Sequence, residues 1–328
     1  MDRKLKLGSA KLIIPVVILA FLALFPLLGP DVYYLSFGFI LFTYIALACS
    51  WNIIGGYAGY LSFGHAAFFG IGAYTTALLL IELGLSPFYT CLVGGIVAAV
   101  FAGIVGYPVL RLKGPYFALA TLCLGLAVPV VVINLEATGS AVGLWMPLLP
   151  VDIFTNRLLF YEVMLGLALA IVLLTRWIEK SKFGLGLSSI REDEDTAQTL
   201  GVNATRLKMI AFMLSAFLVG IVGGIYAYYR TYIHPTTVFD LHISITIVLM
   251  AIFGGSRWWL GPVIGATILT VINEILTAFL GIPGEVSRIM YGLLLVLVIM
   301  FMPNGIMSFV QRRRAPQRKE GLVSQPEV

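Results

Sequence analysis

Long apolar runs, separated by short clusters of Gly, Pro and charged residues, dominate the hydrophobic pattern of this 328-residue chain. A helix needs about 20 predominantly apolar residues to cross the hydrocarbon core of a bilayer. With breaks placed at Gly, Pro and charge clusters, about ten spans are predicted, at residues 12–30, 35–54, 63–83, 88–110, 115–134, 158–176, 209–229, 242–256, 261–280 and 286–303. The runs lack the alternation of a transmembrane barrel, so they predict helices. The expected fold class is an all-α polytopic membrane protein.

Composition narrows the class of protein further. Hydrophobic residues make up 60% of the chain and charged residues 11%, whereas an ordinary soluble domain is about 25% charged. A soluble fold has no interior large enough for that much apolar surface. The chain is therefore expected to divide into a cytoplasmic N-terminus (1–11), a transmembrane domain (12–303) with one long cytoplasmic loop (177–208), and a basic cytoplasmic tail (304–328).

The positions of Lys and Arg test this topology, because basic residues gather in short cytoplasmic loops. With the N-terminus inside, eighteen of the 21 basic residues fall in inner segments, and Arg157, Arg230 and Arg288 fall in outer ones. Both termini are therefore predicted to be cytoplasmic. The same topology accounts for the net charge of +5, so the expected partner is membrane lipid and no nucleic acid.

Carboxylates inside a membrane usually mark an ion or proton pathway. Here they map near the outer ends of spans or in outer loops, at Glu82, Glu136, Glu162, Asp240, Glu274 and Glu285. Glu274 comes nearest to an exception, because it lies about two turns inside its span. It either anchors the outer rim, with Arg288 as a candidate partner, or has a further role. A secondary transporter driven by protons or sodium would need ionisable residues near the midplane, so it is the weaker alternative.

The loop at 177–208 carries the signals of a short helix. Ser189 followed by Glu192 has the spacing of a capping box, and Gly201 is a typical C-terminal stop, so a helix is predicted over about 190–200. One face would hold Ile190, Ala197 and Leu200, and the rest of the surface Arg191, Glu192, Asp193 and Asp195. The helix is either a solvated connector or a docking element whose rigidity carries a partner's motion into the spans.

A stretch from residue 55 to residue 72 is unusually rich in small and polar residues for a membrane protein. It includes Gly59, Ser62, Gly64, His65, Gly70 and Gly72. Small residues let helices pack closely. The alternative is that a locally irregular backbone lines a solute path, where carbonyls and amides can meet a polar substrate. For His65, an interhelical or gating hydrogen bond is preferred to a role as a substrate ligand.

Candidates for enzyme chemistry are sparse. Neither the histidines nor the cysteines show metal-ligand spacing; they are His65, His234, His242, Cys49, Cys91 and Cys123. No nucleophile–base pair is recognisable, and the chain has no GxxxxGK[ST] phosphate-binding loop. We therefore expect no catalytic residue, cofactor or metal site, and any ATP hydrolysis that drives transport must belong to separate polypeptides.

Five sequence blocks resemble, in their order and spacing, the LivM-type permeases of branched-chain amino acid ABC transporters. They are GYAGYLSFGHAAFFGIGAY (56–74), RLKGPYFALATLCLG (111–125), SSIREDEDTAQTLGVNATRLKMIAFMLSAFLVGIVGGIYA (188–227), IFGGSRWWLGPVIGA (252–266) and MPNGI (302–306). The resemblance covers nearly the whole chain. It implies a permease that translocates branched-chain amino acids across the bacterial inner membrane by ATP-driven alternating access. The family also includes permeases for urea, short amides and aromatic acids.

The resemblance also implies partners: two ABC ATPase subunits, a LivH-like paralogous permease and a periplasmic solute-binding protein that sets most of the selectivity. Residues 188–201 look like the family's coupling helix, related to the EAA-x-x-x-G loop of ABC importers. Asp195 and Thr196 depart from that pattern, whereas Ala197 and Gly201 keep it. The residues implied to couple the chain to an ATPase are Ile190, Arg191, Glu192, Asp195, Ala197, Leu200 and Gly201.

Overall fold

The computed structural model of the chain describes residues 21–29, 31–147 and 151–279, together with scattered positions between 281 and 307. Its helices are α2 (Val32–Asn52), α3 (His65–Leu83), α4 (Pro87–Val109), α5 (Pro115–Asn134), α6 (Ile153–Lys180), α7 (Lys182–Glu192), α8 (Glu194–Thr199), α9 (Ala204–Arg230), α10 (Pro235–Val238), α11 (Leu241–Gly254) and α12 (Leu260–Glu274). The π-helices η2 (Ile53–Tyr57) and η5 (Ile275–Phe279) continue α2 and α12. Short 3-10 turns lie at Phe25–Leu28, Glu136–Thr138 and Ser140–Val142.

Eight helices of the described part are long and apolar enough to cross a membrane. They are Val32–Tyr57, His65–Leu83, Pro87–Val109, Pro115–Asn134, Ile153–Lys180, Ala204–Arg230, Pro235–Gly254 and Leu260–Ala278. They confirm the eight spans predicted between residues 35 and 280, each to within seven residues at its ends. The predicted spans 12–30 and 286–303 and the predicted segments 1–11 and 304–328 lie mostly or wholly outside the described residues. The total of about ten spans therefore stays a prediction.

Local sequence explains where these helices begin and end. Pro87 and Pro115 are the first residues of α4 and α5, where the missing amide proton has no intrahelical partner to lose. Asp152 caps α6, because its carboxylate accepts a hydrogen bond from the amide of Phe154 at 3.2 Å. Gly84 ends α3 in the left-handed conformation, with φ +63°.

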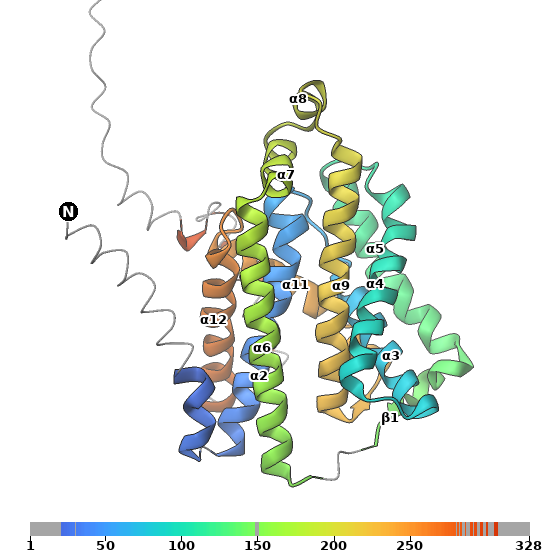
Figure 1. Cartoon of the computed structure of the whole chain (residues 1–328), viewed down its shortest axis with the longest axis vertical. Helices are drawn as coiled ribbons and strands as arrows, with labels where there is room; N and C mark the ends of the chain where they lie inside the picture. Colours follow the sequence, from blue (N-terminus) through green and yellow to red (C-terminus); the bar gives the residue numbers. More distant parts are fainter. Residues whose placement is uncertain are drawn as a thin grey trace, which may run out of the picture.

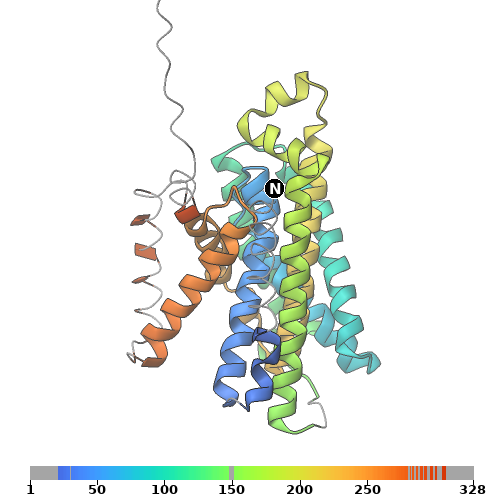
Figure 2. The same cartoon turned by 60° about the vertical axis from the view of Figure 1, so that its left-hand side comes forward.

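Two groups of helices build the bundle. In the first, α3, α4 and α9 lie side by side and approach closely at glycines (Figure 1). Gly72 of α3 lies against Gly220 of α9, where a Cβ atom would overlap main-chain atoms, and Gly94 of α4 packs on Gly72. In the second group, α2 packs against α6 and α12 and runs beside α6 along much of its length (Figure 2). Contacts between α2 and α9 join the two groups.

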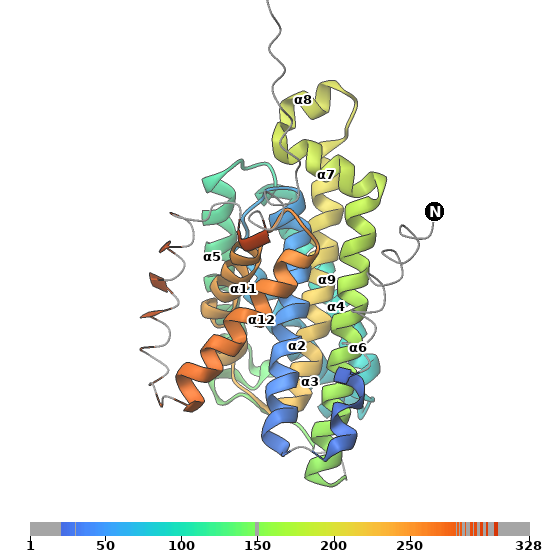
Figure 3. The same ribbon diagram turned by 90° about the vertical axis from the view of Figure 1, so that its left-hand side faces the viewer.

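Segments predicted to share a side of the membrane lie together at one end of the bundle. Lys113, which follows α4, pairs with Asp195 of α8 at 2.8 Å, and Arg257, which follows α11, pairs with Glu192 of α7 at 3.3 Å. At this end α7 and α8 extend beyond the spans, as all three views show (Figures 1–3). The charge pattern predicts that this end is cytoplasmic, and we refer to it as the cytoplasmic end.

The opposite end holds a short β ladder. The two-residue strands β1 (Leu144–Trp145) and β2 (Tyr232–Ile233) pair antiparallel. Apart from this ladder the described fold is all-α, as predicted. Tyr33 of α2 donates a hydrogen bond to Glu274 of α12, which ties two helices together and fits the anchoring role predicted for Glu274. The proposed partner Arg288 lies outside the described residues.

Candidate functional site

The cytoplasmic segment predicted as one helix is two helices. α7 begins at Lys182, one residue after a cap at Ser181, and ends at Glu192. Asp193 then takes an extended conformation and α8 begins after it. The predicted helix start at Ser189 is therefore wrong, because the Ser189 hydroxyl donates a hydrogen bond to a carbonyl inside α7.

A stronger cap explains the correction. The carboxylate of Asp193 accepts a hydrogen bond from the amide of Thr196 at 2.5 Å, and this bond lowers the pKa of the Asp193 carboxyl. Glu194 and Asp195 follow in the first turn of α8, where negative charge is stabilised by the helix dipole. Asp193 is thus a favourable N-cap for α8. The Ser–x–x–Glu spacing alone does not reveal that Ser189 lies inside α7.

Exposure separates the residues that were predicted to share one face. Ile190 and Ala197 are buried, whereas Leu200 is 79% exposed, so Leu200 does not lie on their face. Gly201 ends this segment with φ +88°, which confirms the predicted stop. The carboxylates of Glu192, Asp193 and Asp195 are exposed. The ion pairs of Glu192 with Arg257 and of Asp195 with Lys113 contribute little to stability in water.

Arg191 does not point into solvent, contrary to the prediction of a polar surface there. Its guanidinium donates a hydrogen bond to the carbonyl of Gly56, in the π-helix that continues α2. Its aliphatic part lies against Gly59, which has φ +76° and no side chain to obstruct it. Burial, and then the nearby charge of Arg257, lowers the pKa of Arg191. α7 is thereby attached to residues 53–64, which we call the α2–α3 connection.

A buried ion pair attaches α8 to the same connection. Lys208 of α9 lies 2.7 Å from Glu194, and the two side chains are 4% and 13% exposed. Tyr60 of the connection donates its hydroxyl proton to Glu194 and accepts a hydrogen bond from Lys208 at 2.9 Å. The ammonium also donates to the carbonyl of Leu110 at 3.2 Å, so all three of its protons are used. Burial by itself raises the pKa of Glu194, but the hydrogen bonds from Lys208 and Tyr60 outweigh it and the pKa is lowered.

Neither Glu194 nor Lys208 was singled out from the sequence. Lys208 counts there as one of the cations that mark the cytoplasmic side, and Glu194 stands in an acidic run at 192–195. One signal was available: Lys208 lies directly beside the apolar run at 209–229, and a cation at such a boundary needs a partner if it is buried. The identity of that partner depends on how α8 folds back onto α9.

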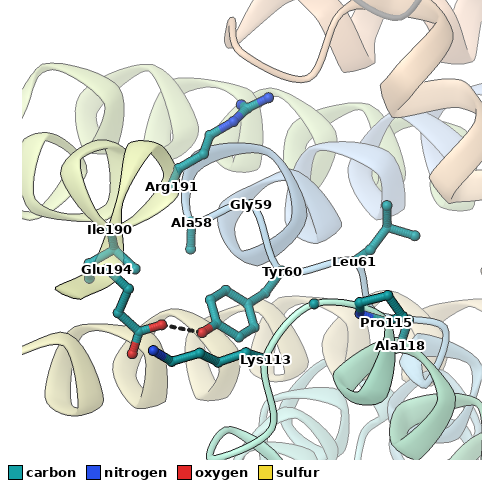
Figure 4. A pocket seen from close by; sticks show the side chains of 11 residues that line it. Ala58, Gly59, Tyr60, Leu61, Lys113, Pro115, Ala118, Ile190, Arg191 and Glu194 are labelled. Atoms are coloured by element: carbon teal, nitrogen blue, oxygen red, sulfur yellow. Dashed lines mark hydrogen bonds between the residues drawn. The ribbon is translucent and has the colours of Figure 1, made fainter. Parts of the chain in front are cut away.

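Two cavities flank the α2–α3 connection. The first has a volume of about 380 Å³ and lies between the connection, the turn after α4, and α7–α8 (Figure 4). In this view Glu194 and Tyr60 point toward each other, while Arg191 extends away from them. The second cavity, of about 400 Å³, adjoins the end of α11. The residues that line both are Gly59, Leu61 and Arg191.

Ser62 and His65 belong to a buried chain of hydrogen bonds. The Nδ1 atom of His65 lies 3.1 Å from the Ser62 hydroxyl, and Nε2 lies 2.7 Å from the hydroxyl of Ser215 in α9. Ser215 donates its proton to the carbonyl of Ser50 at 2.7 Å, so its oxygen must accept from His65. Nε2 of His65 therefore carries a proton and donates it to Ser215, and Nδ1 shares a hydrogen bond with the Ser62 hydroxyl. This is the interhelical bond predicted for His65, and it engages both ring nitrogens; a gating role stays a prediction.

The remaining glycines of the stretch lie in packed surroundings. A Cβ atom at Gly70 would overlap the ring of Phe239, and one at Gly64 would come within 2.9 Å of the Thr121 carbonyl. Together with the contact between Gly72 and α9, these positions favour the packing interpretation. Gly59 differs, because it lines both cavities.

The arrangement forms a continuous mechanical junction. Exposed residues of α8 lead to Glu194 and Arg191, these hold the α2–α3 connection, and the connection leads through Ser62 and His65 into α9. Each link is a hydrogen bond or an ion pair, and all but the bond between Ser62 and His65 join elements distant in sequence. Such a junction can carry a displacement of α7 and α8 into the spans.

Comparisons with known proteins bear on what this junction serves. A model of the family described as "Branched-chain amino acid transport system / permease component" matches residues 33–299. The chain is 31% identical over 296 residues to the "High-affinity branched-chain amino acid transport system permease protein LivM" of Salmonella typhimurium, covering 82% of this chain and 68% of that protein.

More distant relatives match as well. The chain is 23% identical to the "Probable branched-chain amino acid transport permease protein LivM" of Methanocaldococcus jannaschii, covering 84% of this chain and 94% of the relative. It is 22% identical to the corresponding LivH protein of Salmonella typhimurium, covering 81% and 91%. Among solved structures, "PsaBC from Streptococcus pneumoniae in complex with Fab" is similar with a TM-score of 0.42 and 15% identity over 84% of this chain and 94% of that one. A likeness of this size carries no argument.

Proposed function

The chain belongs to the family of branched-chain amino acid transport system permease components, and on that premise we propose that it is a permease subunit of an ABC importer in the bacterial inner membrane. Its substrates are branched-chain amino acids, because the relatives named above are permeases for that class. The match over residues 33–299 is the observation that carries the proposal. ATP hydrolysis takes place on two separate ATPase subunits, and a LivH-like paralogue completes the membrane pore.

The cytoplasmic end supports this assignment. α7 and α8 extend beyond the spans (Figure 1), and the turn after α8 presents Leu200 with 79% of its surface exposed. An exposed leucine on a capped, charged segment is suited to insert into an apolar groove of a partner, where burying it would contribute about 1.5–3 kcal/mol. We assign that groove to the ATPase and the segment α7–α8 to the coupling element.

The mechanism follows from this placement. A periplasmic binding protein delivers the solute to the outer end of the permease pair. ATP-driven closure of the ATPase subunits displaces α7–α8, and the spans change from outward to inward access. Because the permease alternates between two conformations and leaves most of the selectivity to the binding protein, its interior needs few strongly polar ligands. The ion pairs of the described residues lie instead at the cytoplasmic end.

The test is to replace Leu200 with aspartate in the assembled transporter. Burying an unpaired carboxylate at the docking contact is strongly unfavourable, so Leu200→Asp should abolish uptake, solute-stimulated ATP hydrolysis and co-purification of the ATPase, while the amount of inserted permease stays normal. Gly201→Val should give a milder defect. Nothing lies within 4 Å of a Cβ at Gly201, so the cost is only the strained αL backbone, about 1 kcal/mol or more.

Leu112→Asp is the matched control, because Leu112 is another exposed leucine at the cytoplasmic end and lies on a different loop. This variant should retain the ATPase. If Leu200→Asp binds the ATPase and transports as the wild type does, α7–α8 is only a solvated connector and the proposal loses its structural support.

A further inference from the structure

The α2–α3 connection is built to change shape. Its first part, Ile53–Tyr57, is a π-helix, an arrangement that is rare and frequently found at functional sites. Gly59 follows in a left-handed conformation with φ +76°. Cavities of about 380 and 400 Å³ lie on two sides of Gly59 and Leu61. Gly59 and Leu61 therefore have open space on two sides, and this middle part of the connection can shift without first displacing packed neighbours.

Two contacts tie this segment to the proposed coupling element, one from each of its helices. Arg191 of α7 donates to the carbonyl of Gly56, near the start of the connection. Glu194 of α8 accepts the hydroxyl proton of Tyr60, about one turn later in the chain. Each bond includes a charged group: the guanidinium of Arg191 is the donor in the first, and the carboxylate of Glu194 is the acceptor in the second. Such hydrogen bonds are stronger than neutral ones.

The far end of the connection is tied to the spans. The indole of Trp51 in α2 donates to the carbonyl of Ser62 at 2.8 Å, and Ser62 contacts His65, which reaches Ser215 of α9. The amide of the next residue along, Ala66, donates to Ser244 of α11 at 2.8 Å. Two further bonds run to Thr121 of α5, from the amide of Phe63 at 3.1 Å, and to Thr175 of α6, from the hydroxyl of Tyr57 at 3.2 Å. A movement of the connection therefore acts on six spans: α2, α3, α5, α6, α9 and α11.

We infer that residues 53–64 form the cytoplasmic gate of the permease, and that Arg191 and Glu194, the latter through Tyr60, are the positioning residues that move it when the ATPase displaces α7–α8. This inference rests on the proposed function and specifies how that function is carried into the membrane. Lys208 keeps Glu194 ionised and in place. The exposed pairs of Glu192 and Asp195 are not part of the linkage.

The experiment uses the complete transporter, reconstituted with its ATPase and binding protein, and measures ATPase retention, ATP hydrolysis and uptake separately. Arg191→Met keeps the aliphatic part that packs on Gly59 and removes the donor. Tyr60→Phe keeps the ring, which packs edge-on against Phe117, and removes the hydroxyl. Both variants should retain the ATPase and hydrolyse ATP within about twofold of wild type. Uptake should fall about tenfold, the change expected when a charge-assisted hydrogen bond is lost from one state of a gating equilibrium.

Matched controls remove the same chemical groups elsewhere. Arg230→Met removes an arginine at the opposite end, and Tyr161→Phe removes a tyrosine hydroxyl that donates to Leu22 at 2.9 Å; both should transport normally. Arg191→Lys retains a cationic donor and should restore part of the uptake lost in Arg191→Met. A merely structural role would lower ATPase retention and uptake together, without this separation.

The outcomes distinguish the inference from the proposal beneath it. Normal uptake by Arg191→Met and Tyr60→Phe would overturn the gate while leaving the permease assignment intact. Loss of the ATPase in these variants would also overturn it, because the residues would then belong to the docking surface. Failure of the wild-type permease to bind any ATPase would instead refute the proposed function itself.

Discussion

Replacing Gly72 with alanine tests whether the glycine-rich stretch serves packing. A Cβ atom at Gly72 would overlap the main chain of Gly220 in α9, and Gly94 of α4 packs on Gly72 from another side. Main-chain atoms cannot rotate aside as a side-chain tip can, so α3 and α9 must separate. Overpacking of this kind costs about 1–3 kcal/mol, and the lost close approach weakens helix association in the membrane.

Gly166→Ala supplies the matched control. Gly166 lies in α6, and nothing lies within 4 Å of a Cβ built there. The same substitution in a helix without crowding stabilises the fold by up to about 1 kcal/mol, because alanine has the higher helix propensity. Gly72 also lies within a helix, so the propensity gain is common to both variants and they should differ by the packing cost, about 1–3 kcal/mol.

Thermal unfolding of the detergent-purified permease measures this difference. Gly72→Ala should unfold several degrees below Gly166→Ala, since about 1 kcal/mol corresponds to 2–4 °C in domains of 150–250 residues and to less in longer chains. Uptake falls under both the packing and the solute-path interpretation, so folding decides between them. Equal melting temperatures for the two variants, with uptake lost only in Gly72→Ala, would refute the packing argument and favour a solute path.

Three further predictions concern the cytoplasmic end and its orientation. The folded-state pKa of Glu194 is lowered, so its pair with Lys208 stabilises the fold fully when the pH is above the ordinary carboxyl pKa of about 4.3. This stabilisation is lost as the pH falls through the lower folded-state pKa. The difference in melting temperature between wild type and Glu194→Gln should therefore stay constant from neutral pH to about pH 5 and close only below about 4.3. Asp193→Ala should reduce ATPase co-purification by loosening the start of α8, whereas Asp193→Asn, which keeps a capping oxygen, should retain it; equal retention by both would show that the cap is unimportant. In a cysteine-free background, an impermeant maleimide should label Thr199→Cys only in inside-out vesicles and Ala141→Cys only in intact spheroplasts, and the opposite pattern would reverse the predicted orientation.

The lengths of the apolar runs and the residues that flank them were enough to predict the spans. Each of the eight described spans is a run whose flanking Gly, Pro or charged residues mark its ends, and Pro87 and Pro115 begin their helices directly. Charge asymmetry grouped the loops correctly by end of the bundle, as the pairing of Lys113 with Asp195 shows. These features depend on local composition, which a single sequence displays.

The junction could not be predicted in the same way, because its parts are selected by tertiary contact. Arg191 lies in an acidic, polar segment that predicts a solvated face, yet its acceptor is a main-chain carbonyl at Gly56, which has no signature in sequence. The break at Asp193 turns Glu194 toward α9. A single helix through this point would have no such turn, so the error in the predicted helix start also concealed the ion pair.

The burial of Lys208 bears on why the junction contains charge at all. Removing one partner of a buried pair costs about 3–5 kcal/mol, whereas replacing both by apolar residues is often neutral or stabilising. Stability alone therefore does not require Lys208 and Glu194. The charged pair provides two things that a well-packed apolar pair would not. Glu194 is a directional acceptor for Tyr60, and Lys208 is a donor to the Leu110 carbonyl. Apolar contacts would let α8 slide over α9, while the ion pair fixes one register between α8, α9, the end of α4 and the α2–α3 connection. A coupling element that must deliver a small displacement to a particular segment needs that fixed register, which is the physical reason to expect charge at this buried position.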